Sequence, residues 1–161
     1  MDFEKAWEVI KSNLIPRIRA KRSLALFATV RAKFEGWLKV EVADILCAYG
    51  KVIPEKDLID IVFENSAIEL KTVNTSYKYL GVLNKTKPVT DNVKSVIDDI
   101  YKLKKSSYEN KYVLFIVFPL DDNKYWQKHL NKISQNLEEF KESEIVFFNG
   151  IKGKLYFGKI S

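Results

Sequence analysis

The sequence predicts a single domain of the α/β class, in which helices and β-strands are interspersed along the chain. Amphipathic helical patterns alternate with short β-branched runs, and a hairpin signal lies near the middle of the chain. Further along, one continuous apolar run is typical of a strand buried on both faces. With 161 residues, 47% of them hydrophobic, the chain is long enough to bury a core of this kind.

Composition limits the classes of protein to consider. The single cysteine excludes internal disulfides and a cysteine-based zinc site. No apolar run approaches the ~18 residues of a membrane span, and the N-terminus carries acids without the apolar segment of a signal peptide. We therefore expect a cytoplasmic protein with no membrane segment. The net charge of +6 favours a polyanionic partner.

The N-terminal part of the chain is predicted to be helical and basic. Residues 2–15 form an amphipathic pattern that Pro16 is expected to end or bend. The run 24–30 fits a helix or a strand, and its apolar spacing favours a helix. Residues 9–34 contain no acid and carry seven basic residues, namely Lys11, Arg17, Arg19, Lys21, Arg22, Arg31 and Lys33. We interpret residues 1–33 as a basic helical element added to a core at 34–141 and a C-terminal hairpin at 142–161.

The core begins with a helix over about 34–49, which Gly50 is expected to end. Residues 52–55 form a loop or a short edge strand. Two β-branched runs, 60–63 and 66–71, then flank the turn-prone pair Glu64-Asn65, which predicts a hairpin. A two-residue turn pairs Phe63 with Ser66 and, at the open end, Asp60 with Glu69.

The second half of the core contains a loop, two helices and a buried strand. Residues 74–90 lack a clear period and are predicted to form a loop, whose length suggests a function. Asp91 caps a predicted helix that runs to Leu103. A buried strand follows at 112–118, and the pattern then predicts a helix over 123–141. The chain ends with a hairpin formed by 144–148 and 154–160.

Three ionisable side chains fall on one face of the central hairpin. Side chains alternate along a strand, so Asp60, Glu69 and Lys71 point to the same side. Directly opposed Cβ atoms lie roughly 4.5–5.5 Å apart, and two carboxylates that close destabilise a sheet. A bound divalent cation would offset this repulsion. The pattern therefore predicts a metal site made by Asp60 and Glu69, with a lysine beside it.

At these residues the sequence resembles the PD-(D/E)xK nuclease superfamily, the fold of restriction endonucleases and related resolvases. Asp60 matches the isolated acid, and Glu69-Leu70-Lys71 matches the E-x-K element. Only eight residues separate Asp60 from Glu69, which implies a tighter hairpin than is usual in the superfamily, and a literal Pro-Asp pair is absent. The resemblance implies an α-β-β-β-α-β core, with a mixed central sheet flanked by helices.

The resemblance also implies roles for individual residues. Asp60 and Glu69 would hold Mg²⁺ or Mn²⁺, the Leu70 carbonyl would add a ligand, and Lys71 would orient or deprotonate the attacking water. The superfamily often supplies a further glutamate from the helix before the first core strand. Glu41 is the candidate for that position as both a catalytic and a metal-binding residue, and Glu35 is the alternative.

The expected function is a metal-dependent nuclease that hydrolyses phosphodiester bonds in DNA. Two active sites on duplex DNA would require a homodimer. The alternative is a catalytically silent nucleic-acid-binding protein of the same fold. For either function, the residues expected to contact nucleic acid are Arg17, Arg19, Lys21, Arg22, Arg31, Lys33, Tyr77, Lys78, Lys85 and Lys87.

Overall fold

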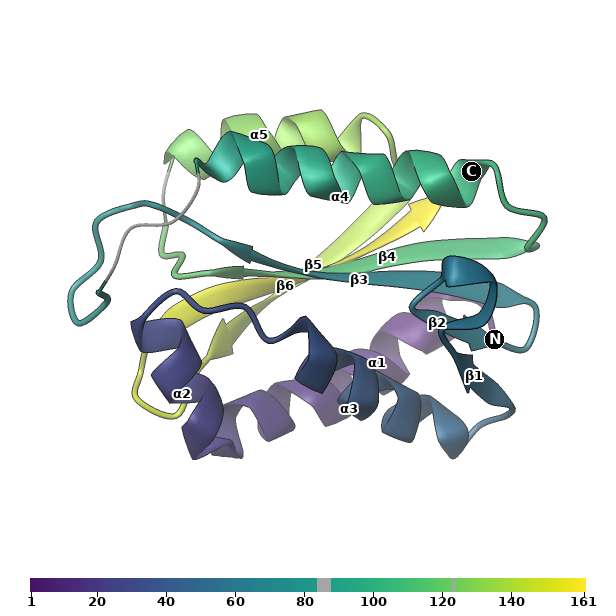
Figure 1. The fold of residues 1–161 in the computed structure, drawn as a ribbon, viewed down its shortest axis with the longest axis horizontal. Helices are drawn as coiled ribbons and strands as arrows, with labels where there is room; N and C mark the ends of the chain where they lie inside the picture. Colours follow the sequence, from purple (N-terminus) through teal and green to yellow (C-terminus); the bar gives the residue numbers. More distant parts are fainter. Residues whose placement is uncertain (84–87, 123) are drawn as a thin grey trace.

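The fold is known from a computed structural model that describes residues 1–83, 88–122 and 124–161. A six-stranded mixed sheet separates two layers of helices (Figure 1). The elements follow the order α1 (Phe3–Ala20), α2 (Arg22–Thr29), α3 (Glu35–Cys47), β1 (Val52–Pro54), η1 (Lys56–Leu58), β2 (Ile61–Phe63), β3 (Ser66–Asn74), α4 (Val89–Lys104), β4 (Asn110–Phe118), α5 (Lys124–Ser134), β5 (Glu139–Val146) and β6 (Lys152–Ile160). The predicted α/β class is confirmed.

The strands lie in the order β1-β2-β3-β4-β6-β5, and only β3 and β4 run parallel. A parallel pair needs a crossover connection, and α4 provides it across one face of the sheet. The predicted hairpin register is confirmed for β2, with Phe63 opposite Ser66 and Ile61 opposite Ile68. The predicted pairing of Asp60 with Glu69 is wrong, because Asp60 lies in a bend before β2 begins. Strand β4 lies in the middle of the sheet and is buried from Tyr112 onward, which explains its unbroken apolar sequence.

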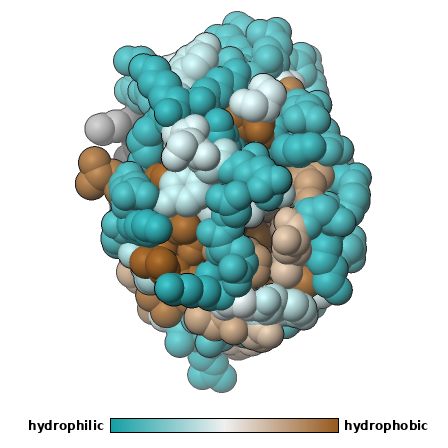
Figure 2. Space-filling model, turned by 90° about the vertical axis from the view of Figure 1, so that its right-hand side faces the viewer, coloured by the Kyte–Doolittle hydropathy of each residue, from teal (hydrophilic) through white to brown (hydrophobic). Residues whose placement is uncertain are grey.

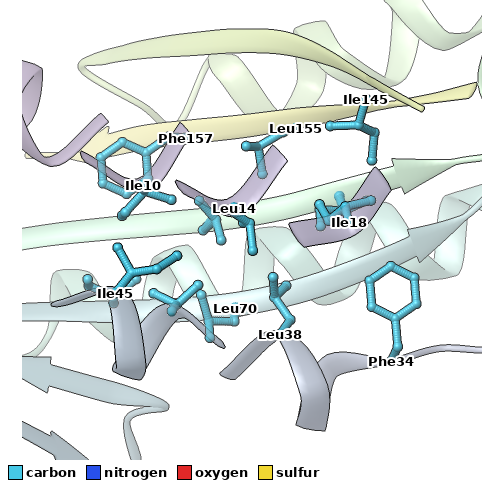
Figure 3. Packing of buried hydrophobic residues seen from close by; sticks show 14 of the residues in the cluster. Ile10, Leu14, Ile18, Phe34, Leu38, Ile45, Leu70, Ile145, Leu155 and Phe157 are labelled. Atoms are coloured by element: carbon cyan, nitrogen blue, oxygen red, sulfur yellow. The ribbon is translucent and has the colours of Figure 1, made fainter. Parts of the chain in front are cut away.

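Each face of the sheet carries its own hydrophobic core. One core joins the sheet to α1 and α3, and the other joins it to α4 and α5. Figure 3 shows the first, in which Ile10, Leu14 and Ile18 of α1 lie over sheet side chains that include Leu70 and Phe157. Helix α1 is therefore part of the core that it shares with α3 and the sheet, although the sequence suggested an added N-terminal element.

Two predicted helix boundaries are wrong. Helix α1 continues through Pro16 to Ala20, because Leu14 and Ile18, on either side of the proline, are both fully buried and their packing outweighs one lost hydrogen bond. Helix α5 ends at Ser134, and Glu139–Val146 is strand β5, paired with β6 along its whole length. Leu137 and Phe140 continue the apolar spacing of α5 by chance, so the sequence pattern extended the helix into this strand.

The end of the molecule on the right of Figure 1 faces the viewer in Figure 2. Hydrophilic residues cover most of this end, and hydrophobic residues gather in the lower half of the view, on the side of α1 and α3. Among the described residues, no helix combines the length and the apolar character needed to cross a membrane.

Candidate active site

The candidate site forms where β2 separates from β3. On β3, strand β2 pairs only with residues 66–68, whereas β3 itself continues to Asn74 along β4. The edge of β3 beyond Ile68 is therefore open, and carboxylates satisfy its backbone amides. Asp60 Oδ2 accepts a hydrogen bond from Leu70 N at 2.8 Å, and Glu35 Oε1 accepts one from Thr72 N at 3.0 Å. The N–H and C=O of one strand residue point to the same side, so the Leu70 carbonyl also faces this edge.

Asp60 reaches this edge from a turn with unusual backbone geometry. Three non-glycine residues of the turn have left-handed φ angles, 57° at Glu55, 55° at Asp57 and 62° at Leu58. Such conformations cost of order 1 kcal/mol each and persist only where the surroundings fix them. Here the Lys102 ammonium donates to the Leu58 carbonyl at 2.7 Å, and Tyr108 donates to the Asp57 carboxylate at 2.6 Å.

Asp60 and Glu69 lie together, as predicted, with very different electrostatic surroundings. Burial works against ionisation of Asp60, but hydrogen bonds from Lys39 and the Leu70 amide outweigh it and lower its pKa. Lys39 Nζ lies 2.9 Å from Asp60 Oδ1. The pKa of Glu69 is raised to about 8, mainly because the side chain is buried. The Lys102 ammonium lowers this pKa, and the neighbouring Asp60 carboxylate raises it. Two acids thus share one site with their pKa values moved apart.

Lys71 lies on the same face, where α4 covers it. Its ammonium is 3.4 Å from Asp99 Oδ2, and one turn further along α4 Lys102 forms an ion pair with Glu69. Burial tends to lower the Lys71 pKa, but the charges of Asp99 and Glu35 outweigh it and raise the pKa above its usual value. Lys71 is therefore held as a cation at neutral pH.

Of the two candidate helix carboxylates, the structure places Glu35 and not Glu41 beside the hairpin residues. Glu41 points away from the hairpin and pairs with Arg17, whose guanidinium is 2.7 Å from Glu41 Oε2 and 2.7 Å from Asp44 Oδ2. Glu35, the alternative, lies at the first turn of α3 and contacts Thr72 beside Lys71. Glu41 faces α1 because its turn of α3 packs on that helix, whereas the start of α3 reaches the sheet edge.

Three residues of the site were missed by the sequence prediction: Lys39, Asp99 and Lys102. Asp99 and Lys102 are three residues apart on α4, so their side chains point the same way. This spacing was readable from the sequence. That they face β3 follows only from the parallel β3–β4 crossover, which places α4 over Glu69 and Lys71.

A divalent cation fits this donor set. Carboxylate and carbonyl oxygens are the ligands that Mg²⁺ prefers, and it is commonly held by one or two carboxylates with several waters. Asp60, Glu69 and the Leu70 carbonyl would provide these ligands. Within residues 1–83, 88–122 and 124–161, no group of three or more His, Cys, Asp or Glu side chains surrounds a metal position. The remaining ligands would be water and substrate.

The expected nucleic-acid contacts divide into three groups. Arg31 is buried, and its guanidinium donates to the carbonyls of Thr75, Tyr77 and Leu83, so the expectation for Arg31 is wrong. Arg17 is occupied by its two acids, and Tyr77 has a buried hydroxyl, so neither is presented to a ligand as expected. The side chains that are exposed as the prediction requires are Arg19, Lys21, Arg22, Lys33 and Lys78.

Lys85 and Lys87 fall outside the described residues. The exposed basic residues of α2 and of the loop after β3 lie at the left of Figure 1, whereas β1 and β2 lie at the right. Arg22 also lies over the ring of Phe148, 5.2 Å from its centroid. The structure therefore does not gather these cations around Asp60 and Glu69; the lysines nearest those acids are Lys39, Lys71 and Lys102.

The chain has limited similarity to known proteins. It matches no protein-family model and no solved structure. It is similar to a Lon protease from Aster yellows witches'-broom phytoplasma (strain AYWB), with 30% identity over 125 residues, which cover 66% of this chain and 16% of that protein. The chain therefore spans less than a fifth of that relative's length.

Proposed function

We propose that this protein is a metal-dependent nuclease that cleaves phosphodiester bonds in DNA. The observation that carries the proposal is the convergence of Asp60, Glu69 and Lys71 at the open edge of β3, beside the Leu70 carbonyl. The order α3-β1-β2-β3-α4-β4 adds support, because it is the α-β-β-β-α-β order of the core that the sequence resembles.

In this proposal Asp60, Glu69 and the Leu70 carbonyl hold Mg²⁺ or Mn²⁺. The bound ion supplies a polarised phosphate oxygen and a water of lowered pKa. Lys71 remains protonated because Asp99 and Glu35 raise its pKa, so it donates to the charge that develops on the phosphate and does not remove the water proton. Glu35, held on the Thr72 amide, is the carboxylate placed to orient the attacking water.

The second candidate is a DNA-binding protein without catalytic activity. The observation that favours it is the neutralisation of both acids by lysines, Asp60 by Lys39 and Glu69 by Lys102. If these ion pairs persist in solution, no cation is needed at the site. This protein would shift DNA in a salt-dependent manner and cleave none of it.

One assay separates the two candidates. Plasmid, single-stranded and branched DNA are incubated with Mg²⁺ or Mn²⁺ and the wild type, Lys71→Ala or Glu69→Gln protein. Lys105→Ala is the matched control, since Lys105 is an exposed lysine near Lys102. We expect cleavage by the wild type and the control, and a loss of at least about a hundredfold in the two site variants. Full activity in Glu69→Gln would refute the assignment.

A further inference from the structure

The ion pairs that α4 makes with the E-x-K residues differ in how firmly they are held. Lys71 and Asp99 are both largely covered, with side chains 23% and 15% exposed. Glu69 is nearly inaccessible at 4%, but its partner Lys102 is 44% exposed. One pair is thus enclosed on both sides, whereas the other joins a buried acid to a cation that extends from the surface.

A buried carboxylate needs a counter-charge. Leaving one ionised without a partner costs several kcal/mol, and Glu69 also lies against Asp60. Lys102 supplies this charge whenever Glu69 is ionised, and at the same time it donates to the Leu58 carbonyl of the strained turn before β2. Its ammonium therefore bridges the acid and the turn that delivers Asp60.

The Lys102 side chain also borders open space into which it can move away from Glu69. It lines a surface hollow together with Asp57, Ile59, Lys105 and Tyr108, and its flexible side chain can extend there into water. Lys39, by contrast, is held by Asp60 and Glu55 at once and is only 24% exposed. Of the two lysines that neutralise the acids, Lys102 is the one that can exchange.

We infer that Lys102 is a built-in counter-ion that occupies the cation position at Glu69 and is displaced when a divalent metal binds. This inference rests on the proposed function. It makes Lys102 a positioning residue: it keeps the acid pair and the turn assembled without metal, and it sets the metal concentration at which the site is loaded.

The test compares Mn²⁺ binding by calorimetry at one fixed pH in wild type, Lys102→Met and Lys105→Met. Lys105 lies three residues further along the chain, is exposed and carries the same charge. We expect Lys102→Met to bind Mn²⁺ about tenfold more tightly, the scale of removing one competing charge at short range in a partly screened site. Lys105→Met should differ from the wild type by no more than about twofold.

Equal Mn²⁺ affinity in Lys102→Met and Lys105→Met would overturn the inference and leave the metal site standing. Absence of Mn²⁺ binding in all three proteins would instead overturn the proposed function and the inference with it. Because Lys102→Met could fold poorly, the wild type is also probed by amine-reactive labelling and mass spectrometry. Mg²⁺ should raise the reactivity of Lys102 and leave unchanged that of Lys94, an exposed lysine of α4 that does not line the hollow. Unchanged reactivity at Lys102 on saturation with Mg²⁺ contradicts displacement.

Discussion

The Asp60 carboxylate accepts a hydrogen bond from the backbone amide of Leu70 at 2.8 Å, just where β2 has stopped pairing with β3. The same carboxylate is an ion-pair partner of Lys39 and a neighbour of Glu69. One side chain thus closes the open edge of a strand and forms half of the candidate metal site. Stability and function should therefore respond to different substitutions at Asp60.

Asp60→Ala should lower the free energy of unfolding by about 1–3 kcal/mol, because the Leu70 amide and the Lys39 ammonium lose their acceptor. Asp60→Asn retains an oxygen for Leu70 and should lose less. Urea denaturation measures both, with Asp98→Ala on the exposed side of α4 as a control expected within about 0.5 kcal/mol of the wild type. Equal losses in Asp60→Ala and Asp60→Asn would show that the hydrogen bond is unimportant.

Glu69 should make the protein less stable as the pH rises. Burial, together with Asp60, raises its pKa in the folded chain to about 8 from 4.5, so the folded state binds the proton more tightly than the unfolded state. The stabilisation is complete below the unfolded pKa and is lost as the pH rises through the folded pKa, with a slope of up to about 1.4 kcal/mol per pH unit.

Glu69→Gln cannot ionise, so its free energy of unfolding should change less than that of the wild type across this window. The measurement is denaturation by urea at about pH 5, 6.5 and 8 without added metal. The titration of Asp60 does not interfere, because its pKa is lowered and lies below the window. A wild-type slope that survives unchanged in Glu69→Gln would assign the effect to another group.

Glu35 and Glu41 should differ in their effect on cleavage. Glu35→Gln replaces the carboxylate beside Lys71 with a neutral amide and should reduce the cleavage rate by about tenfold or more. Glu41→Gln affects only the partly exposed pair with Arg17 and should leave the rate unchanged, with a stability loss below about 1 kcal/mol. Plasmid nicking under identical Mg²⁺ concentrations compares the two, and the reverse ranking would restore Glu41 as the helix carboxylate.

Arg31 should act through stability rather than through DNA affinity. Arg31→Met leaves the carbonyls of Thr75, Tyr77 and Leu83 without the guanidinium and should cost about 2–3 kcal/mol. Thermal denaturation measures this loss, and limited proteolysis should show faster cleavage within residues 75–83. Arg19→Met, which removes an exposed cation, should have little effect on either readout. Comparable losses in the two variants would contradict a structural role for Arg31.

The local parts of the fold could be predicted from the chain alone. The hairpin was predicted with the register that residues 61–63 and 66–68 adopt, because β-branched runs around a two-residue turn leave little choice of pairing. The buried strand at β4 was equally clear from its unbroken apolar run. The boundaries of α1 and α5 were wrong, because packing around Pro16 and the pairing of β5 with β6 outweigh the local pattern.

The sequence by itself determined the hairpin that carries Asp60, Glu69 and Lys71, since alternation along paired strands is a property of neighbouring residues. Only the tertiary structure decided what surrounds these side chains. The crossover of α4 places Asp99 and Lys102 over them, and the packing of α3 brings Glu35, and not Glu41, to the edge of β3. The reason is physical: contacts between distant segments depend on which faces of the helices the two cores bury, and a local pattern does not contain that choice.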